Sequence, residues 1–443
     1  MNLPFCDSLR QLYQRLVPPD FFDQLQQEHP WSNRGIYLPP LVLWLMVRQQ
    51  LYGNGTLAEG VEQVMLGQPR DLLPQHKRIR DGTVSSNTGA YSQARKRLPL
   101  EAVEKVSRRV FDEVLKTSAE EGLASRVYLL DGSGILLSHT KELVDDFPPA
   151  TNQRGLSHWP VIRVVVAHNL ANGAALQPCW GPMFGKKAVS EQSLAEQLMD
   201  QLPPQSVVVG DRNFGVFSIA FATQSKGHHV LVRMTKARAQ RVWGGSLPTS
   251  NGDREVEWVP TRDDRRRHPH FPADARLRGR LIVWHVQRHG QIVVLYLFTT
   301  LPLPASEIVE LYGRRWNIET DLRSLKQTLH LGQLRSKSTK MVAKELISGV
   351  MAYNLVRAVQ IAAAQSAGLE PRELSFSQVQ IVVNTWLPTL LAATSAEQFH
   401  QAFQRMLRSA AQHKLPKRRR RRGYPRAVWG RPQVFPRRKA KTA

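Results

Sequence analysis

Short apolar runs that lead directly to an acidic residue stand out in the middle of the chain. Residues 126–130 form one such run before Asp131, and residues 206–210 form another before Asp211. Runs of this length, followed by glycine and other turn-forming residues, are typical of buried strands. We therefore predict two strands that each carry an aspartate at the end.

The residues between these two runs predict further elements of the same layer. Residues 161–167 indicate a third strand, and Asn172-Gly173 is a hairpin signal followed by a possible return strand over 174–180. Residues 190–202 have the spacing of an amphipathic helix. The predicted order is a strand with an aspartate, a strand pair, a helix, and a second strand with an aspartate.

Helical patterns dominate the start of the chain, and strand patterns dominate the stretch after Asp211. Helices are expected over residues 41–51, from a cap at Thr56 to residue 67, from Thr88 to residue 98, and over residues 100–114. Strands are expected over residues 227–234, 255–260, 277–287 and 291–300. The loop at 262–270 contains His268 and His270, which we expect to be exposed rather than metal-bound.

A charged stretch around Glu319 places this acid among several cations on one predicted helix. At about 100° per residue, Tyr312, Arg315, Glu319 and Lys326 fall within an arc of roughly 60°. The leucines and the isoleucine of the same stretch fall in a separate arc, so the polar set lies beside an apolar stripe. The plain alternative is a solvated face on which Arg315 and Glu319 make an ordinary ion pair.

Glu319 gains significance from the two aspartates at the predicted strand ends. Three carboxylates gathered from distant segments repel one another, so such a cluster normally holds a cation. Oxygen ligands without histidine or cysteine favour Mg²⁺ or Mn²⁺, and two such ions together promote in-line displacement at phosphorus. Arg315 and Lys326 beside Glu319 would then bind phosphates of the substrate strand.

These residues resemble the signature of DDE transposases of bacterial insertion sequences, specifically the insertion-sequence-4 family. In that signature a Tyr is followed after two residues by an Arg, after three more by a Glu, and after six more by a Lys. Tyr312, Arg315, Glu319 and Lys326 match every spacing. The resemblance extends over about residues 126–357 and includes both aspartate segments.

The resemblance implies a fold, a set of catalytic residues and a cofactor. The family has a ribonuclease-H-like catalytic core with an all-β insertion between the second Asp and the Glu, so the expected fold class is α+β. Asp131, Asp211 and Glu319 would be the catalytic and metal-binding triad, with two Mg²⁺ or Mn²⁺ ions per site. The residues expected to bind DNA are Tyr312, Arg315, Arg323, Lys326, Arg95 and Arg97.

Three regions follow from these patterns. Residues 1–120 would form a helical DNA-binding domain, because Arg95 and its neighbours resemble the family's amino-terminal DNA-binding region; a plain helical bundle is the alternative. Residues 121–413 would form the catalytic domain, with a β-rich insertion at about 222–303 and carboxy-terminal helices at about 340–413. Residues 414–443 would form a flexible basic tail.

The composition of the chain indicates a polyanionic binding partner. The chain has 61 Lys and Arg against 36 Asp and Glu, which gives a net charge of +25. Residues 414–443 carry 13 of these cations and no acid, with prolines and glycines that disfavour a packed domain. We expect this tail to attract DNA phosphates without regard to sequence, and a solubilising or vestigial terminus is the alternative.

Cysteine usage and hydropathy predict a cytoplasmic protein. Cys6 and Cys179 lie far apart in the chain, which predicts neither a disulfide framework nor a thiolate metal site. The amino terminus lacks the pattern of a secretory signal, and the apolar run at 41–47 is far shorter than the ~20 residues of a membrane span. We expect a bacterial enzyme that is associated with the nucleoid through DNA.

The predicted function is DNA transposition. The protein would bind the terminal inverted repeats of its element, pair two ends as a homodimer, hydrolyse a phosphodiester to free a 3′-OH, and join that hydroxyl to target DNA. The alternatives are a metal-dependent nuclease of the same fold, a DNA-binding protein without catalysis, and a tyrosine recombinase that uses Tyr312. Some relatives flip a base onto a tryptophan of the insertion, for which Trp243, Trp258 and Trp284 are the candidates.

Overall fold

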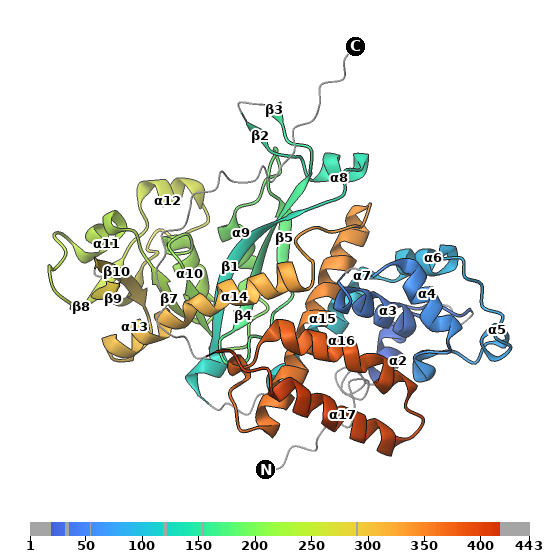
Figure 1. Ribbon diagram of the computed structural model, residues 1–443. Coiled ribbons are helices and arrows are strands. Elements are labelled where there is room, and N and C mark those ends of the chain that lie inside the picture. The colour runs from blue at the N-terminus through green and yellow to red at the C-terminus, as the bar shows by residue number, and fades with distance from the viewer. Residues whose placement is uncertain are drawn as a thin grey trace.

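A mixed β-sheet packed against helices forms the centre of the molecule (Figure 1). The computed structural model describes residues 19–31, 35–53, 55–117, 122–152, 155–288 and 291–416. The first 18 residues of the predicted DNA-binding domain and residues 417–443 of the predicted tail lie outside this described part of the chain.

Eight strands form this sheet in the order β5-β4-β1-β6-β7-β10-β9-β8. β1 runs parallel to β6, β6 runs parallel to β7, and the other neighbours are antiparallel. The bounds are Val127–Leu136 (β1), Val161–Asn169 (β4), Cys179–Pro182 (β5), Val207–Gly210 (β6), His229–Arg233 (β7), Gly252–Trp258 (β8), Leu277–Arg288 (β9) and Gln291–Thr299 (β10). A separate hairpin pairs β2 (Thr151–Asn152) with β3 (Gly155–Leu156).

The predicted strands are present, with one correction at Asp131. The apolar start of β1 pairs with β6 only over residues 127–129, whereas β1 continues past Asp131 to Leu136 along β4. Antiparallel pairing uses backbone groups, so the Gly-Ser-Gly segment after Asp131 extends the strand instead of ending it. Asp131 therefore lies in the middle of a strand, close to the end of the shorter β6.

The strand pair between the two aspartates also forms, although its second strand begins later than predicted. Gly173 has a φ of +78°, a left-handed conformation that glycine adopts without steric cost, and so closes the predicted hairpin turn. Leu176 N then donates to Ala167 O, and the regular pairing of β5 with β4 starts at Cys179. The helix predicted next is α9 (Glu191–Met199), which packs on β4 and β5.

The segment predicted as one helix around Glu319 is divided into four parts. They are α13 (Ala305–Gly313), a 3₁₀ turn (Arg314–Trp316), α14 (Asn317–Arg323) and a π turn (Ser324–Thr328). Ser324 Oγ donates to Thr320 O at 3.0 Å, a side-chain bond of the kind that bends helices. A 3₁₀ turn tightens the helix and a π turn widens it, so the uniform spacing of 100° per residue does not hold through this segment.

The described part of residues 1–120 is helical, as predicted. Thr56 Oγ1 accepts a hydrogen bond from Glu59 N while the Glu59 side chain bonds Thr56 N, so a capping box begins α4. The helices are α2 (Pro19–Glu28), α3 (Pro39–Leu51), α4 (Leu57–Met65), α5 (Lys77–Arg80), α6 (Gly89–Arg97) and α7 (Leu100–Thr117), with 3₁₀ turns at Arg70–Leu72 and Leu123–Arg126. A further short helix, α8 (Lys141–Asp146), follows β1.

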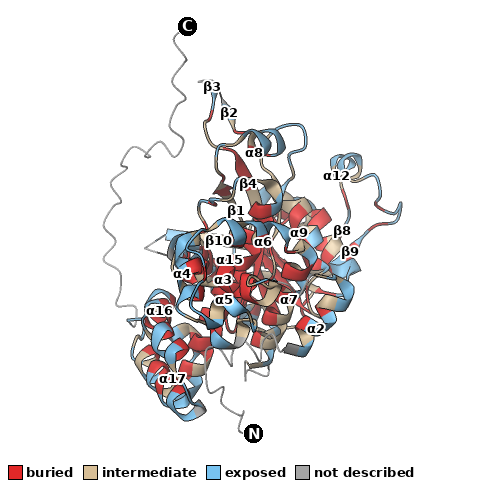
Figure 2. Ribbon diagram, turned by 90° about the vertical axis from the view of Figure 1, so that its right-hand side faces the viewer, coloured by how far each residue is buried: buried red, intermediate tan, exposed pale blue. Residues whose placement is uncertain are grey.

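One long helix, α15 (Thr339–Ser366), packs against both the amino-terminal and the carboxy-terminal helices in a common core. It packs against α3 and α7 from the amino-terminal part and against α16 (Phe376–Ala392) and α17 (Ala396–Ala411) that follow it. Among the described residues it is the single helix long and apolar enough to cross a membrane, but 94% of its most apolar window is buried inside the protein. Figure 2 shows the buried residues gathered around this helix and the sheet.

The predicted insertion is rich in strands but is not all-β. β8, β9 and β10 continue the central sheet beyond β7, and two helices, α11 (Lys236–Trp243) and α12 (Arg262–Arg267), lie between the strands. Thr235 and Thr261 cap these helices, which explains why polar segments between strands become helical. Together with α10 (Phe217–Ser225), this region encloses a second hydrophobic core that includes Phe298.

Candidate active site

Asp131 and Asp211 lie on neighbouring parallel segments of the sheet. Asp131 is two residues beyond the last pair between β1 and β6, and Asp211 directly follows Gly210, the last residue of β6. Each carboxylate accepts a local backbone hydrogen bond at 2.8 Å, Asp131 from Gly132 N and Asp211 from Asn213 N. The register of two parallel strands thus brings together two of the three predicted carboxylates.

The surroundings of Asp131 make its negative charge costly. Burial raises the pKa of Asp131 to about 6, and the carboxylates of Asp211 and Glu191 act in the same direction. The hydrogen bond from Gly132 N and the nearby Arg315 guanidinium oppose this shift. A carboxyl group with such a raised pKa beside a second carboxylate is typical of a site that binds a cation or moves a proton.

Arg315 links Glu319 to the two aspartates, because its guanidinium lies near both Glu319 and Asp131. The helix of Glu319, α14, contacts β1 and crosses in front of the sheet in Figure 1, but the Glu319 carboxylate forms an ion pair with Arg315, with 3.8 Å between Nη2 and Oε1. The Glu319 side chain is 44% exposed. Nowhere in the described residues do three His, Cys, Asp or Glu side chains gather closely enough to hold a metal ion. The side chains of the predicted triad are therefore not gathered into a metal-binding group in this structure.

Arg315 is the cation at the centre of the site. Besides Glu319 and Asp131, it lies near two aromatic rings, 6.0 Å from the ring centroid of Tyr312 and 5.2 Å from that of Trp316. Its side chain is 12% exposed, and its buried Nε has no hydrogen-bond partner within the described residues. An unused guanidinium donor next to two carboxylates suits an anionic ligand such as a phosphate.

Lys326 is held against the strand that carries Asp131. Its Nζ donates to Ser133 Oγ at 2.8 Å, because the π turn places Lys326 over β1. Burial lowers the pKa of Lys326, whereas the Asp131 carboxylate opposes this shift. Sequence reasoning did not include Ser133, although its position two residues after Asp131 on the same strand face was a usable signal.

Tyr312 lies at this site but is buried instead of exposed on a polar face. It is 6% exposed and belongs to the hydrophobic core, and burial raises the pKa of its hydroxyl. Arg315, Arg233 and Asp211 are close enough to influence that pKa. Arg323, also predicted to bind DNA, ends α14 with an exposed side chain.

On the opposite side of α14, Asp321 closes a buried ion-pair network. Arg357 Nη2 donates to Asp321 Oδ1 at 2.6 Å, and Arg372 donates to both carboxylate oxygens at 3.1 and 2.9 Å. Burial alone would raise the pKa of Asp321, but the two arginines hold it below its ordinary value. This network ties the helix of Glu319 to α15 and to the segment before α16.

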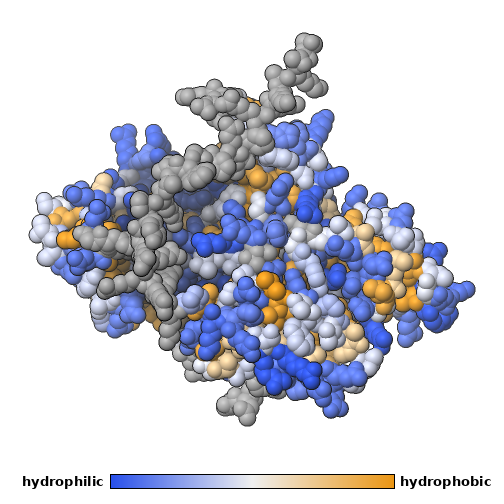
Figure 3. Space-filling model, in the orientation of Figure 1, coloured by the Kyte–Doolittle hydropathy of each residue, from blue (hydrophilic) through white to orange (hydrophobic). Residues whose placement is uncertain are grey.

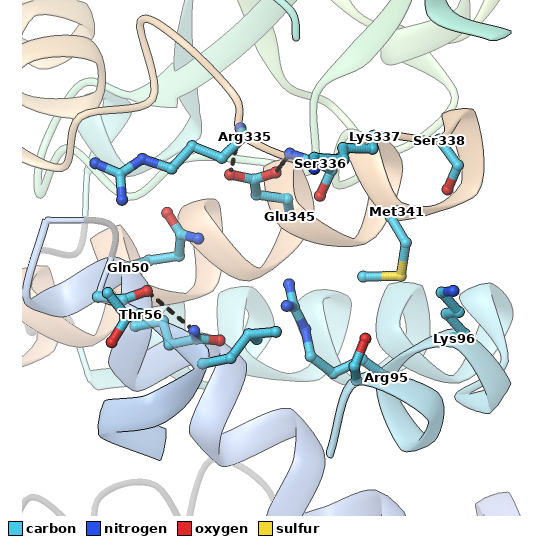
Figure 4. Close-up of a pocket in the computed structure, with 14 residues that line it drawn as sticks. Gln50, Thr56, Arg95, Lys96, Arg335, Ser336, Lys337, Ser338, Met341 and Glu345 are labelled. Atoms are coloured by element: carbon cyan, nitrogen blue, oxygen red, sulfur yellow. Dashed lines mark hydrogen bonds between the residues drawn. The ribbon is translucent and has the colours of Figure 1, made fainter. Parts of the chain in front are cut away.

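A groove separates the amino-terminal helices from the chain after the π turn (Figure 4). It has a volume of about 580 Å³, and Arg95 and Lys96 lie on one wall with Arg335 and Lys337 on the other. Two adjacent residues of α15 hold these walls. Lys344 Nζ donates to the carbonyls of residues 95 and 96 at 3.0 Å, and Glu345 accepts from the backbone N–H groups of residues 335 and 336.

Of the two arginines predicted from α6, Arg95 lines this groove, whereas Arg97 is exposed at the end of the helix and is not among the groove residues. The burial of Lys344 and Glu345 could not be inferred from charge patterns, because charged residues normally face solvent. The space-filling view shows a largely hydrophilic surface on the face seen in Figure 1 (Figure 3).

The other predicted aromatic and histidine candidates lie in the insertion. Trp258 is buried in the second core, and Trp243 packs against that core, 5.7 Å from the Arg254 guanidinium. Trp284 is partly buried and packs against the main core. His268 and His270 both pack around Phe271, and burial lowers the pKa of His268.

Comparisons with known proteins identify the family to which this chain is similar. A family model described as "Transposase DDE domain" matches residues 123–355, which contain Asp131, Asp211 and Glu319. The chain is also 30% identical over 358 residues to the transposase InsG for insertion sequence element IS4 of Escherichia coli (strain K12). That alignment covers 78% of this chain and 77% of the relative.

Proposed function

This chain belongs to the DDE transposase family, enzymes that cleave and join DNA during transposition, and we propose that Asp131, Asp211 and Glu319 are its catalytic carboxylates. The observation that carries this proposal is the juxtaposition of Asp131 and Asp211 at adjacent strands, with Arg315 between Asp131 and Glu319. The spacing of the Tyr-Arg-Glu-Lys residues supports Glu319 as the third carboxylate.

We propose that β5, β4, β1, β6 and β7 are a ribonuclease-H-like core. An antiparallel unit of three strands followed by two parallel strands supports this assignment, since the two aspartates then come from its first and fourth strands in sequence. The strands β8 to β10 would be the insertion, which extends the same sheet. The helices before residue 118 would belong to the DNA-binding region.

Members of this family depend on a divalent metal, and the donor chemistry here fits Mg²⁺ or Mn²⁺. Asp131, Asp211 and Glu319 offer oxygen ligands only, and a cation would relieve the repulsion that contributes to the raised pKa of Asp131. Glu319 would be the third ligand, so its carboxylate would face the metal ion instead of Arg315. Two ions, when bound, would activate the attacking oxygen and stabilise the leaving oxygen.

The residues around the carboxylates would orient the DNA strand. Arg315 Nε has no hydrogen-bond partner among the described residues, and Lys326 is held over the strand of Asp131, so we assign both side chains to oxygens of the scissile phosphate. Water would attack in line with the leaving 3′ oxygen, and the freed 3′-OH would then attack target DNA in the same way. No covalent enzyme intermediate is required, and the burial of Tyr312 disfavours it as a nucleophile.

DNA would extend from this site along the basic groove. The groove cations Arg95, Lys96, Arg335 and Lys337 suit phosphates, and the basic tail would add contacts that do not depend on sequence. The proposed substrates are the terminal inverted repeats of the element and a target duplex, paired in a homodimer. We place this reaction in the bacterial cytoplasm, on the nucleoid.

A strand-transfer assay separates this function from its alternatives. Full-length protein is mixed with Mg²⁺, a labelled duplex that carries a precleaved element end, and a supercoiled target plasmid. A transposase joins the labelled strand to the plasmid, whereas a nuclease of the same fold cuts without joining and a binding protein does neither. Failure to join precleaved ends, with the fold intact and the ends bound, would contradict the proposal.

A further inference from the structure

The first turn of α9 is bonded to the loop that carries Asp211. Gln192 Nε2 donates to both the main-chain and the side-chain oxygen of Asn213, each at 2.9 Å. The Asn213 amide in turn donates from Nδ2 to Glu191. Both hydrogen-bonding ends of the Asn213 side chain are therefore held by consecutive residues of one helix.

Asn213 transmits this contact to the carboxylate of Asp211. The backbone N–H of Asn213 donates to Asp211 Oδ1 at 2.8 Å, so the orientation of the Asp211 carboxylate depends on the position of Asn213. Turns of this kind, in which an aspartate bonds the backbone two residues later, fix the local chain direction. The helix end and the Asp211 loop thus form one connected unit.

Glu191 also contacts the segment that carries Asp131. A Cβ atom added to Gly132 would lie 2.5 Å from Glu191 Cδ, so the Glu191 carboxylate occupies the space that the missing side chain leaves. Its charge lies close enough to raise the pKa of Asp131. Glu191 therefore bridges the two aspartate segments, against Gly132 on one side and Asn213 on the other.

We propose that Glu191 and Asn213 are positioning residues that fix the distance between the carboxylates of Asp131 and Asp211 and so determine how tightly the active site holds a divalent metal. This inference rests on the proposed role of the two aspartates as metal ligands. Mg²⁺ demands nearly ideal ligand geometry, and partners that orient ligands commonly change metal affinity 10- to 100-fold. Asn213 is exposed, so its contribution to folding is small.

Metal binding by the full-length protein without DNA tests the proposal, with free Mn²⁺ measured by electron paramagnetic resonance. Asn213→Ala and Glu191→Ala should weaken Mn²⁺ binding about 10- to 100-fold. Their melting temperatures in EDTA should change by less than about 2 °C. Glu191→Gln keeps an oxygen that accepts from Asn213 and should lose less affinity than Glu191→Ala. The exposed Gln197→Ala on the same helix is the matched control and should bind Mn²⁺ normally.

Two further sets of variants keep the outcomes distinct. Gly132→Ala displaces the Glu191 carboxylate without removing it, and it should weaken Mn²⁺ binding even if Asn213→Ala fails to fold. Wild-type Mn²⁺ affinity in folded Asn213→Ala, Glu191→Ala and Gly132→Ala would overturn the positioning role. Asp131→Ala and Asp211→Ala report on the premise: if they too bind Mn²⁺ normally, the proposed metal ligands are wrong as well.

Discussion

Asp321 and Glu319 lie two residues apart on α14 and have opposite surroundings. Asp321 is completely buried and bonded to Arg357 and Arg372, whereas the Glu319 side chain is 44% exposed and 3.8 Å from a single guanidinium. On the buried side, hydrogen bonds from two arginines saturate the carboxylate. On the open side, Arg315 keeps a buried donor without a partner in the described part of the chain.

On this short helix, Asp321 therefore serves folding, whereas Glu319 is available for chemistry. A buried carboxylate between two arginines cannot be removed without leaving their charges uncompensated in the core. An exposed carboxylate with a distant partner contributes little to folding and is available for a metal ion. We therefore expect substitutions on the two sides of α14 to affect different measurements.

The largest expected effect is on stability at Asp321. Asp321→Ala should lower the free energy of unfolding by about 3–5 kcal/mol, because it leaves the buried Arg357 and the partly buried Arg372 without their carboxylate. Glu319→Ala, the matched control on the same helix, should change it by no more than about 0.5 kcal/mol. Urea unfolding followed by circular dichroism measures both, and equal losses would abolish the contrast between the two sides.

On the open side, Lys326→Ala should slow DNA cleavage about 10²- to 10³-fold, the usual cost of removing a donor that stabilises developing charge. Its free energy of unfolding should change by less than about 1 kcal/mol. Single-turnover cleavage and urea unfolding of the same preparation give both values, with the exposed Lys340→Ala as the control. An unfolded or aggregated Lys326→Ala protein would instead indicate that the contact between Lys326 and Ser133 is structural.

Removing the charge of Asp131 should raise the free energy of unfolding, by less than the loss expected at Asp321. The pKa of Asp131 is raised from 3.8 to about 6 in the folded protein, so the folded state binds a proton more tightly and loses stability as the pH rises through this window. In EDTA at pH 7, Asp131→Asn should therefore increase the free energy of unfolding by about 2–3 kcal/mol. The gain should vanish below about pH 4, where the wild-type carboxyl is also neutral.

Thermal unfolding at several pH values measures this gain, with the exposed Asp145→Asn as the control. A loss of stability in Asp131→Asn at pH 7 would show that Asp131 makes a favourable structural interaction. It would then resemble Asp321 more than Glu319.

The smallest effect concerns the basic tail. Lys414 pairs with Leu374, and Leu415 N donates to Glu373 O, so the chain stays attached to the fold slightly beyond the predicted boundary at 414. Deleting residues 417–443 should flatten the slope of log affinity against log salt by about 0.9 for each DNA phosphate that the tail neutralises. Binding to random DNA and to element ends should weaken by similar factors, and selective loss of end recognition would make the tail a specificity element.

Local patterns predicted most of the elements of this molecule. The apolar runs predicted β1 and β6, and the hairpin signal at Asn172-Gly173 predicted the turn before β5. The cap at Thr56 predicted the start of α4. These features depend on neighbouring residues, so the sequence contains the information directly. The motif around Glu319 likewise led to Arg315 and Lys326, which lie near Asp131.

Features that depend on distant segments could not be predicted in this way. The polar residues after Asp131 gave no sign that β4 would extend the strand, and the charge of Asp321 gave no sign that Arg357 and Arg372 would enclose it. The sequence indicates only that Glu191 lies in the first turn of a helix, and its contact with Gly132 follows from the folded sheet. Partners of buried charges follow from the tertiary fold, which pattern and spacing do not contain.

Single-turnover cleavage of a labelled inverted-repeat duplex by Glu319→Gln in Mg²⁺ tests the central claim most directly. The substitution keeps the size of the side chain and removes one metal-ligand charge, and binding of the same duplex is measured in parallel. We predict that cleavage is abolished while end binding and the free energy of unfolding stay close to those of the wild type. Cleavage at the wild-type rate would show that Glu319 is not a catalytic carboxylate.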